Sequence, residues 1–147
     1  NKVKKSDYRM PLPKAYGPPV GKVADIPRTN KVAYGAYLAG PIGHCVECHT
    51  PMVRGRRDWS RTGLGGQDFH GPWGVSVAAN LTPDKDTGLG DWTDAEIKRA
   101  IRQGISKDGR KLTPPMGYAY YRRAKPADVD AIVAYLRSLK PLPITAR

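Results

Sequence analysis

An all-α fold, in which three main helices are separated by long loops, is what this sequence predicts. Three segments carry apolar residues three and four positions apart, the spacing that places them on one face of a helix: residues 30–39, a segment beginning at Thr93 and a segment beginning near Pro126. The 147 residues also include 16 glycines and 14 prolines, so much of the chain between these segments is expected to be loop.

The first helical segment has an apolar stripe made of Val32, Ala36 and Ala39. Asn30 or Thr29 can cap it, because the side-chain oxygen of either can accept a hydrogen bond from a free backbone N–H of the first turn. Gly35 stands beside the stripe. A glycine inside a helix costs roughly 1 kcal/mol relative to alanine, so we expect another helix to cross closely there. Gly40 and Pro41 are expected to end the helix.

The second and third helices have clear signals at their ends. Thr93 and Glu96 match the capping box pattern, in which each side chain bonds to the backbone N–H of the other residue, and Gly104 marks the end of this helix. Pro126 suits the first turn of the last helix, where its missing N–H is not needed, and Pro141 is expected to stop that helix. The apolar faces consist of Ile97, Ala100 and Ile101 in the second helix and of Val129, Ile132, Val133, Leu136 and Leu139 in the third.

The predicted organisation is one domain with an extension at each end. Residues 1–28 are rich in proline and are expected to form an extended arm rather than a helix. Residues 29–141 form the domain, and residues 142–147 form a C-terminal tail. Within the domain, a short strand pair is expected between Phe69 and Ala79, in otherwise irregular chain.

The chemistry of the chain is concentrated in Cys45-Val46-Glu47-Cys48-His49, which contains the only two cysteines. Two intervening residues allow both thiols to form thioether bonds with the two vinyl groups of one haem, and the histidine that follows is then held under the iron as its proximal ligand. The sequence therefore predicts one covalently bound haem c with its iron, attached through Cys45 and Cys48 and ligated by His49.

Three other uses of a paired cysteine motif remain open at this point. A thioredoxin-like redox pair opens a helix after a strand, whereas here a helical segment precedes Cys45. A zinc site needs two further ligands, and the remaining histidines, His44 and His70, do not form a closely spaced pair. A structural disulfide between Cys45 and Cys48 suits an exported protein but gives no role to His49.

Met116 is the predicted sixth ligand of the iron, on the side opposite the histidine. It ends the sequence Leu112-Thr113-Pro114-Pro115-Met116, whose prolines stiffen the loop that would present the thioether. The alternatives are that Met116 fills the core, the commoner use of methionine, or that His70 takes the sixth position. Met10 lies in the proline-rich arm, and Met52 stands too close to the haem motif in sequence to reach the opposite face.

Taken together, these motifs resemble those of a class I, monohaem cytochrome c, and more closely the cytochrome c domains of periplasmic alcohol and gluconate dehydrogenase cytochrome subunits. The shared residues are Gly35-Ala36-Tyr37-Leu38 before Cys45, Asn80-Leu81-Thr82-Pro83-Asp84, Thr87-Gly88-Leu89-Gly90-Asp91-Trp92, Pro114-Pro115-Met116 and the run from Asp130 to Leu139. The likeness covers about residues 29–141. It implies a cytochrome c fold wrapped around one haem, with the first and last helices crossing near Gly35 and Tyr135.

Several residues are assigned supporting roles around the haem. The second ring nitrogen of His49 should donate to a backbone carbonyl, which orients the imidazole, and we expect that carbonyl near Pro72. Trp92 either donates its indole N–H to a haem propionate or is a buried core residue, and Asn80 either serves the propionates or caps a turn. The cations that flank the methionine loop either surround the exposed haem edge or form an ordinary solvated surface; they are Arg110, Lys111, Arg122, Arg123 and Lys125.

The chain is strongly basic, with 25 lysines and arginines against 13 acidic residues and a net charge of +12. This charge favours an acidic redox partner or an anionic membrane surface. No recognisable nucleic-acid-binding motif accompanies it, and no apolar run approaches 18 residues, so neither nucleic acid nor a transmembrane span is expected. The polar start of the chain indicates a mature, exported form without its signal peptide, and the periplasm is the expected location.

The predicted function is one-electron transfer rather than catalysis, because both axial positions of the iron would be filled. The carrier would connect a dehydrogenase or quinol-oxidising complex to a terminal acceptor. Two alternatives remain. One is a tethered cytochrome subunit of a single dehydrogenase complex, and the other is a haem ligand sensor or enzyme in which Met116 is not a stable ligand.

Overall fold

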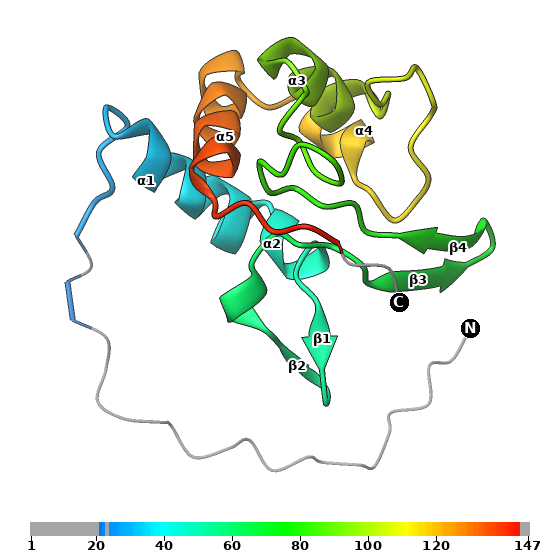
Figure 1. Cartoon of the computed structure of the whole chain (residues 1–147). Helices are drawn as coiled ribbons and strands as arrows, with labels where there is room; N and C mark the ends of the chain where they lie inside the picture. The colour runs from blue at the N-terminus through cyan, green and yellow to red at the C-terminus, as the bar shows by residue number, and fades with distance from the viewer. Residues whose placement is uncertain (1–20, 23, 145–147) are drawn as a thin grey trace, which may run out of the picture.

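The computed structural model describes residues 21–22 and 24–144, so most of the expected N-terminal extension lies outside the described residues (Figure 1). The three helices expected from the sequence are present as α1, α3 and α5. The elements, in chain order, are α1 (Lys31–Tyr37), the π turn η1 (Leu38–Ile42), α2 (Cys45–Cys48), β1 (Met52–Val53), β2 (Arg56–Arg57), the 3-10 turn η2 (Trp59–Arg61), β3 (Asp68–Gly71), β4 (Gly74–Val77), α3 (Asp94–Gln103), α4 (Tyr118–Tyr121) and α5 (Pro126–Ser138).

Helices α1 and α5 cross in close contact and bring the two ends of the domain together (Figure 1). Gly35 is buried at the crossing, where an added Cβ atom would collide with the carbonyl oxygen of Ala131 and lie 2.9 Å from Cβ of Tyr135. The close crossing at Gly35, with Tyr135 beside it, is therefore confirmed. Val32, expected in the buried stripe, is 43% exposed, because the buried residue of α1 is Gly35; Ala39 is buried in the π turn that follows.

Helix α1 begins as expected and ends differently. The side-chain oxygen of Asn30 accepts a hydrogen bond of 3.1 Å from the backbone N–H three residues later, as a helix cap does. The expected end at Gly40 and Pro41 is wrong, because both residues lie inside the π turn η1. In this wider turn the N–H of Gly43 reaches back to the carbonyl of Leu38 at 2.7 Å, so the chain keeps turning although Pro41 supplies no donor.

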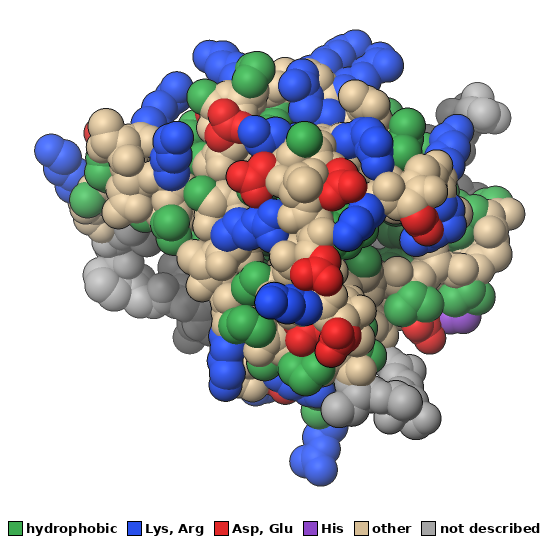
Figure 2. All heavy atoms as spheres, turned by 45° about the horizontal axis from the view of Figure 1, so that its top comes forward, with side chains coloured by type: hydrophobic (Ala, Val, Ile, Leu, Met, Phe, Trp, Pro, Cys, Tyr) green, Lys and Arg blue, Asp and Glu red, His purple; other side chains and the backbone are tan. Residues whose placement is uncertain are grey.

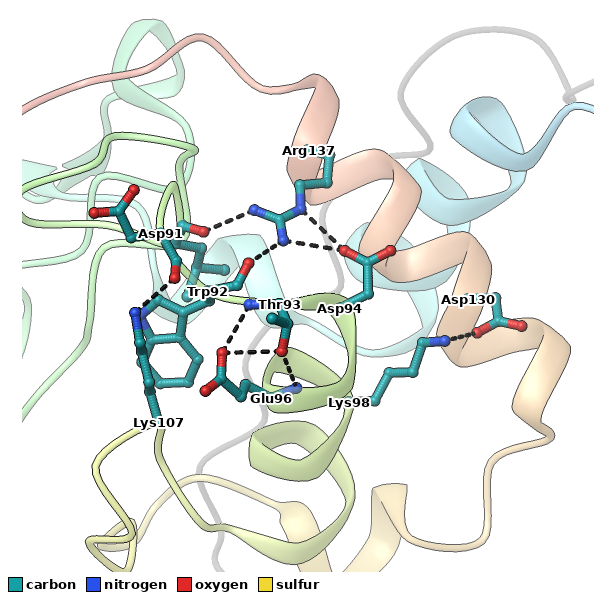
Figure 3. Close-up of polar contacts among 10 residues, drawn as sticks. Asp91, Trp92, Thr93, Asp94, Glu96, Lys98, Lys107, Asp130 and Arg137 are labelled. Carbon is teal, nitrogen blue, oxygen red and sulfur yellow. Dashed lines mark hydrogen bonds and ion pairs between the residues drawn. The ribbon is translucent and has the colours of Figure 1, made fainter.

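Helix α3 is anchored at its first turn by the capping box that the sequence predicts (Figure 3). The hydroxyl of Thr93 accepts from the N–H of Glu96 at 3.3 Å, and the carboxylate of Glu96 accepts from the N–H of Thr93 at 2.7 Å. The N–H of Thr93, and then its hydroxyl, donate to this carboxylate and lower the pKa of Glu96 from its ordinary value. At the other end Gly104, with φ of 69°, adopts the left-handed conformation that ends the helix.

Ion pairs and an arginine join α3 to α5 (Figure 3). Nζ of Lys98 lies 2.5 Å from Oδ1 of Asp130, and a guanidinium nitrogen of Arg137 lies 3.0 Å from Oδ1 of Asp94. The same guanidinium donates to the backbone carbonyl of Trp92. Arg137 therefore holds both the first residue of α3 and the chain that leads into it.

The apolar core lies between α3, α5 and the loop that precedes α3. Its buried members are Leu89, Ile97, Val133 and Leu136, and the partly buried residues packed against them include Trp92, Ile101 and Ile132. Most of these side chains also form part of the wall of the cavity described below. The core and the cavity are therefore continuous, and anything that fills the cavity packs directly on the core.

Two small antiparallel hairpins accompany the helices (Figure 1). Strands β3 and β4 pair with Asp68 opposite Val77, which confirms the strand pair expected between residues 69 and 79. The hairpin of β1 and β2 and the one-turn helices α2 and α4 were not expected, because elements this short have no periodicity to detect. The fold therefore combines the expected helices with two small sheets and long irregular segments. None of the described helices is long and apolar enough to cross a membrane.

Candidate functional site

A cavity of about 450 Å³ lies between α2, α3, α5, the end of β4 and the loop that precedes α4. Its volume is within the range of about 300–1,000 Å³ that is usual for cofactor pockets. The four predicted ligand residues, Cys45, Cys48, His49 and Met116, all line it. The structure thus brings them to one place, together with an apolar wall that includes Ile97, Ile132 and Leu136.

Cys45 and Cys48 are the first and last residues of the one-turn helix α2, and both thiols are half-buried. His44, the residue before this helix, adopts φ of 53°, and its Nδ1 lies 2.5 Å from a carboxylate oxygen of Glu47. This contact links the residue before the first cysteine to the residue before the second cysteine. Burial raises the pKa of the Cys45 thiol to about 11, so this thiol carries its proton at neutral pH.

The imidazole of His49 is oriented by a backbone carbonyl. Its Nδ1 lies 2.7 Å from the carbonyl oxygen of Ala79, so Nδ1–H donates and Nε2 keeps the lone pair that a metal ligand needs. Burial lowers the pKa of His49, and the bond to Ala79 opposes this more weakly, so the ring is neutral at neutral pH. A carbonyl partner is therefore confirmed, but its expected place near Pro72 is wrong.

Ala79 rather than Pro72 reaches His49 because the chain after β4 packs against Gly65, which is itself hydrogen-bonded to His49. Gly65 donates its N–H to the carbonyl oxygen of His49 at 2.8 Å, and an added Cβ on Gly65 would lie 2.5 Å from the carbonyl oxygen of Ala79. The three segments therefore pack directly on one another. Pro72 lies in the exposed turn between β3 and β4, away from this contact.

Met116 is the candidate sixth ligand that lines the cavity. Its loop is fixed by a hydrogen bond of 2.5 Å from the hydroxyl of Ser76, in β4, to the carbonyl of Pro114. His70, the alternative donor, lies exposed on β3, and Met52 on β1 is 46% exposed. Neither side chain is among the described residues that line the cavity, and Met10 lies outside the described residues.

Asn80 and Trp92, each of which had two predicted roles, both line the cavity but differ in their other contacts. Trp92 is half-buried, lines the cavity and packs against the apolar core. Asn80 is buried and its amide is used within the protein, because it donates to the carbonyl of Leu142 at 2.7 Å and to Oγ1 of Thr87 at 3.1 Å, and accepts from the N–H of Thr82 at 2.9 Å. Its role as a turn cap is confirmed, and it also holds the start of the C-terminal tail.

The five cations that flank the methionine loop are all exposed and do not gather around the cavity. Arg110 lines it, whereas Arg122 lines a separate surface groove together with Lys98, Arg99 and Arg102. Figure 2 shows lysine and arginine side chains spread over and around one face of the molecule, with acidic side chains near its middle. The basic surface is therefore broader than the rim of the cavity.

Tyr121 is a residue of the site that sequence reasoning missed. It lies in α4, lines the cavity, and donates its hydroxyl to the carbonyl oxygen of Gly43 at 2.7 Å. Ala79 and Phe69 were also missed as cavity residues. No signal in the sequence identifies any of the three, because each reaches the cavity through folding of a segment that has no motif of its own.

The alternative of a zinc site finds no ligand set in the structure. Among residues 21–22 and 24–144, no three side chains of His, Cys, Asp or Glu are grouped so that they could hold a metal ion. Cys45 and Cys48 are free thiols rather than a disulfide. A haem iron held by one histidine and one methionine does not need such a group.

The chain matches the sequence profile of the cytochrome c family over residues 32–140. It is 41% identical to a nicotinate dehydrogenase subunit from Pseudomonas putida over 100 residues, which are 68% of this chain and 8% of that protein. It is also 38% identical to the cytochrome c subunit of the quinone alcohol dehydrogenase of Gluconacetobacter polyoxogenes. That match extends over 112 residues, which are 76% of this chain and 22% of that subunit. The gluconate 2-dehydrogenase cytochrome c subunit of Pantoea cypripedii is 38% identical over 104 residues, 71% of this chain and 22% of that subunit. The chain therefore spans less than a quarter of the length of these curated relatives.

The cavity fits the group that this family carries. It offers two thiols, an imidazole whose Nε2 is free to bind a metal, a thioether and an apolar wall, which is the donor set and lining that a covalently bound haem c requires. Electron transport through this iron-containing group, and not catalysis, is the activity of the family. By its sequence match and by this fit, the chain belongs to the cytochrome c family.

Proposed function

We propose that Cys45 and Cys48 attach one haem c, that His49 and Met116 are the axial ligands of its iron, and that the domain passes single electrons between redox proteins. One observation carries this proposal: these four side chains line one cavity, and His70 does not. When bound, the haem supplies a one-electron couple, in which the iron gains one electron from a donor protein and gives it to an acceptor.

Each of the four residues has a distinct task. Cys45 and Cys48 add their S–H groups across two vinyl double bonds, a step that balances without an oxidant and makes the cofactor impossible to lose. His49 binds through Nε2, because its Nδ1–H already donates to Ala79. Met116 provides a thioether, which favours ferrous iron and therefore raises the reduction potential relative to a second histidine.

Visible and near-infrared spectra of the holoprotein test this ligand set. The oxidised wild-type protein is expected to show the weak sulfur-to-iron charge-transfer band of a methionine ligand, and Met116→Ala is expected to abolish it. Met52→Ala is the matched control, because Met52 is exposed on β1 and does not line the cavity. A wild-type protein without the band would contradict ligation by Met116. Binding of carbon monoxide to the reduced protein would then favour the ligand sensor or enzyme.

We further infer that the redox partner presents an acidic face. The net charge of +12 and the position of Arg110 at the cavity support this. Electron exchange with such a partner is expected to slow steeply as ionic strength rises, and Arg110→Gln is expected to slow it at low salt. Arg56→Gln, in the exposed hairpin of β1 and β2, is the control and should leave the rate unchanged. A rate that does not depend on salt would contradict electrostatic docking.

The physiological setting we propose is a periplasmic electron-transfer chain fed by a dehydrogenase. It is supported by the names of the relatives, which include cytochrome subunits of alcohol and gluconate dehydrogenases. A tethered subunit of one such complex is the second candidate, favoured because these relatives are themselves named as subunits of dehydrogenases. Fractionation of native cells distinguishes the two. Co-elution with a catalytic subunit supports the tethered form, and a monomer free in the periplasm supports the carrier.

A further inference from the structure

The loop that carries Met116 is fastened on both sides. Before it, the hydroxyl of Ser76 donates to the carbonyl oxygen of Pro114 at 2.5 Å. After it, the hydroxyl of Tyr121 donates to the carbonyl oxygen of Gly43 at 2.7 Å. Gly43 stands two residues before the first cysteine of the haem motif, so the second bond joins the methionine loop to the haem-attachment segment.

Both ends of this second bond are held by the backbone. The N–H of Tyr121 donates to the carbonyl of Gly117 at 3.2 Å, and Gly117 directly follows Met116. On the other side, the N–H of Gly43 donates to the carbonyl of Leu38 at 2.7 Å, in the π turn η1. Movement of Met116 away from the cavity would therefore pull on Tyr121, and the phenol cannot follow without leaving Gly43.

We propose that Tyr121 is a positioning residue, which keeps the thioether of Met116 on the iron by tying its loop to Gly43. This inference rests on the proposed function, since it takes Met116 as the sixth ligand. Tyr121 is half-buried, and burial raises the pKa of its hydroxyl, so the donor proton is retained at neutral pH. The net worth of one neutral hydrogen bond corresponds to about a 3- to 10-fold change in how readily an external ligand displaces Met116.

The test uses imidazole as a probe ligand for the oxidised holoprotein, with loss of the sulfur-to-iron band as the readout. Tyr121→Phe removes the hydroxyl and leaves the ring in the cavity wall, so imidazole is expected to bind about 3- to 10-fold more tightly than to wild type. Tyr120→Phe is the matched control, because Tyr120 is the preceding residue of the same helix, is 83% exposed and does not line the cavity. Equal imidazole affinity in the two variants overturns the inference, even if Tyr121→Phe unfolds at a lower denaturant concentration.

Two further outcomes separate the inference from its premise. A wild-type protein that lacks the band would overturn ligation by Met116, and with it both proposals. A second measurement does not require the variant to fold. When imidazole displaces Met116 in the wild type, the hydroxyl proton of Tyr121, which the bond to Gly43 protects, is expected to exchange several-fold faster, while the amide of Glu96, in the capping box of α3, keeps its rate. An unchanged exchange rate of the Tyr121 hydroxyl proton would show that Met116 leaves the iron without breaking the bond to Gly43, which overturns the inference.

Discussion

The carbonyl oxygen of Ala79 lies 2.7 Å from Nδ1 of His49, thirty residues earlier in the chain. Gly65 packs against both, because its N–H donates to the carbonyl of His49 at 2.8 Å and it leaves no room for a side chain beside Ala79. The orientation of the proposed proximal ligand therefore depends on a glycine in a third segment.

Gly65→Ala tests this dependence, with Gly55→Ala as the matched control. Both glycines have φ of +77°, so both substitutions carry the cost of a left-handed alanine, but a Cβ on Gly55 has nothing within 4 Å. Because only Gly65→Ala pushes on Ala79, we expect it to lower the free energy of unfolding by about 1–3 kcal/mol more than the control. It should also raise the reduction potential, since His49 loses part of its hydrogen bond and donates less to the iron. Equal effects in denaturant unfolding and in potentiometric titration would contradict the role of Gly65.

Gly35→Ala is expected to disrupt the crossing of α1 and α5. The new Cβ would collide with the carbonyl of Ala131, so we expect a loss of about 1–3 kcal/mol in the free energy of unfolding. Gly40→Ala, in the π turn that follows α1, is the control, because a Cβ there meets nothing within 4 Å. Denaturant unfolding should show that this control is neutral or slightly stabilising. A similar change in both variants would show that the close crossing at Gly35 adds no cost of its own.

Arg137→Lys is expected to weaken the junction of α3 and α5, although it conserves the positive charge. A lysine cannot reproduce the fork that donates to the carbonyl of Leu89 at 2.7 Å and also contacts Asp94. We expect a loss of about 1–2 kcal/mol in the free energy of unfolding, measured with urea. Arg123→Lys, at an exposed position, should change this free energy little. The prediction fails if the two variants have the same free energy of unfolding.

Glu96→Gln is expected to reduce the loss of stability in acid. The backbone N–H of Thr93, and then its hydroxyl, lower the pKa of Glu96 in the folded protein. Its contribution to stability is therefore complete above the unfolded pKa, about 4.3, and is lost as the pH falls through the lower folded pKa. Glutamine keeps an acceptor for Thr93 but has no charge and does not titrate, so the variant should be less stable than wild type near pH 7, lose less stability in acid and approach wild type there. Urea unfolding from pH 7 down to pH 3 is the measurement, and parallel curves for the two proteins would exclude this contribution.

The local features of the fold could be read from the sequence because each is encoded within a few residues. The capping box of Thr93 and Glu96 involves side chains three positions apart, and the cap at Asn30 has the same reach. Gly35 was detectable because a glycine inside a helical pattern is costly unless packing requires it. The end of α1 was misjudged because Pro41 stops an α-helix but is tolerated in the wider turn that the tertiary structure imposes.

The sequence by itself determined the chemistry of this protein, because the spacing of Cys45, Cys48 and His49 is a property of five consecutive residues and holds in any fold that places them in one turn. Only the tertiary structure decided which distant groups meet them. It selected Ala79 rather than Pro72 for His49, used Asn80 within the protein, left His70 in solvent and brought Tyr121 to Gly43. Such contacts join segments far apart in the chain, and their geometry follows from how the helices and hairpins pack, which no local pattern of residues records.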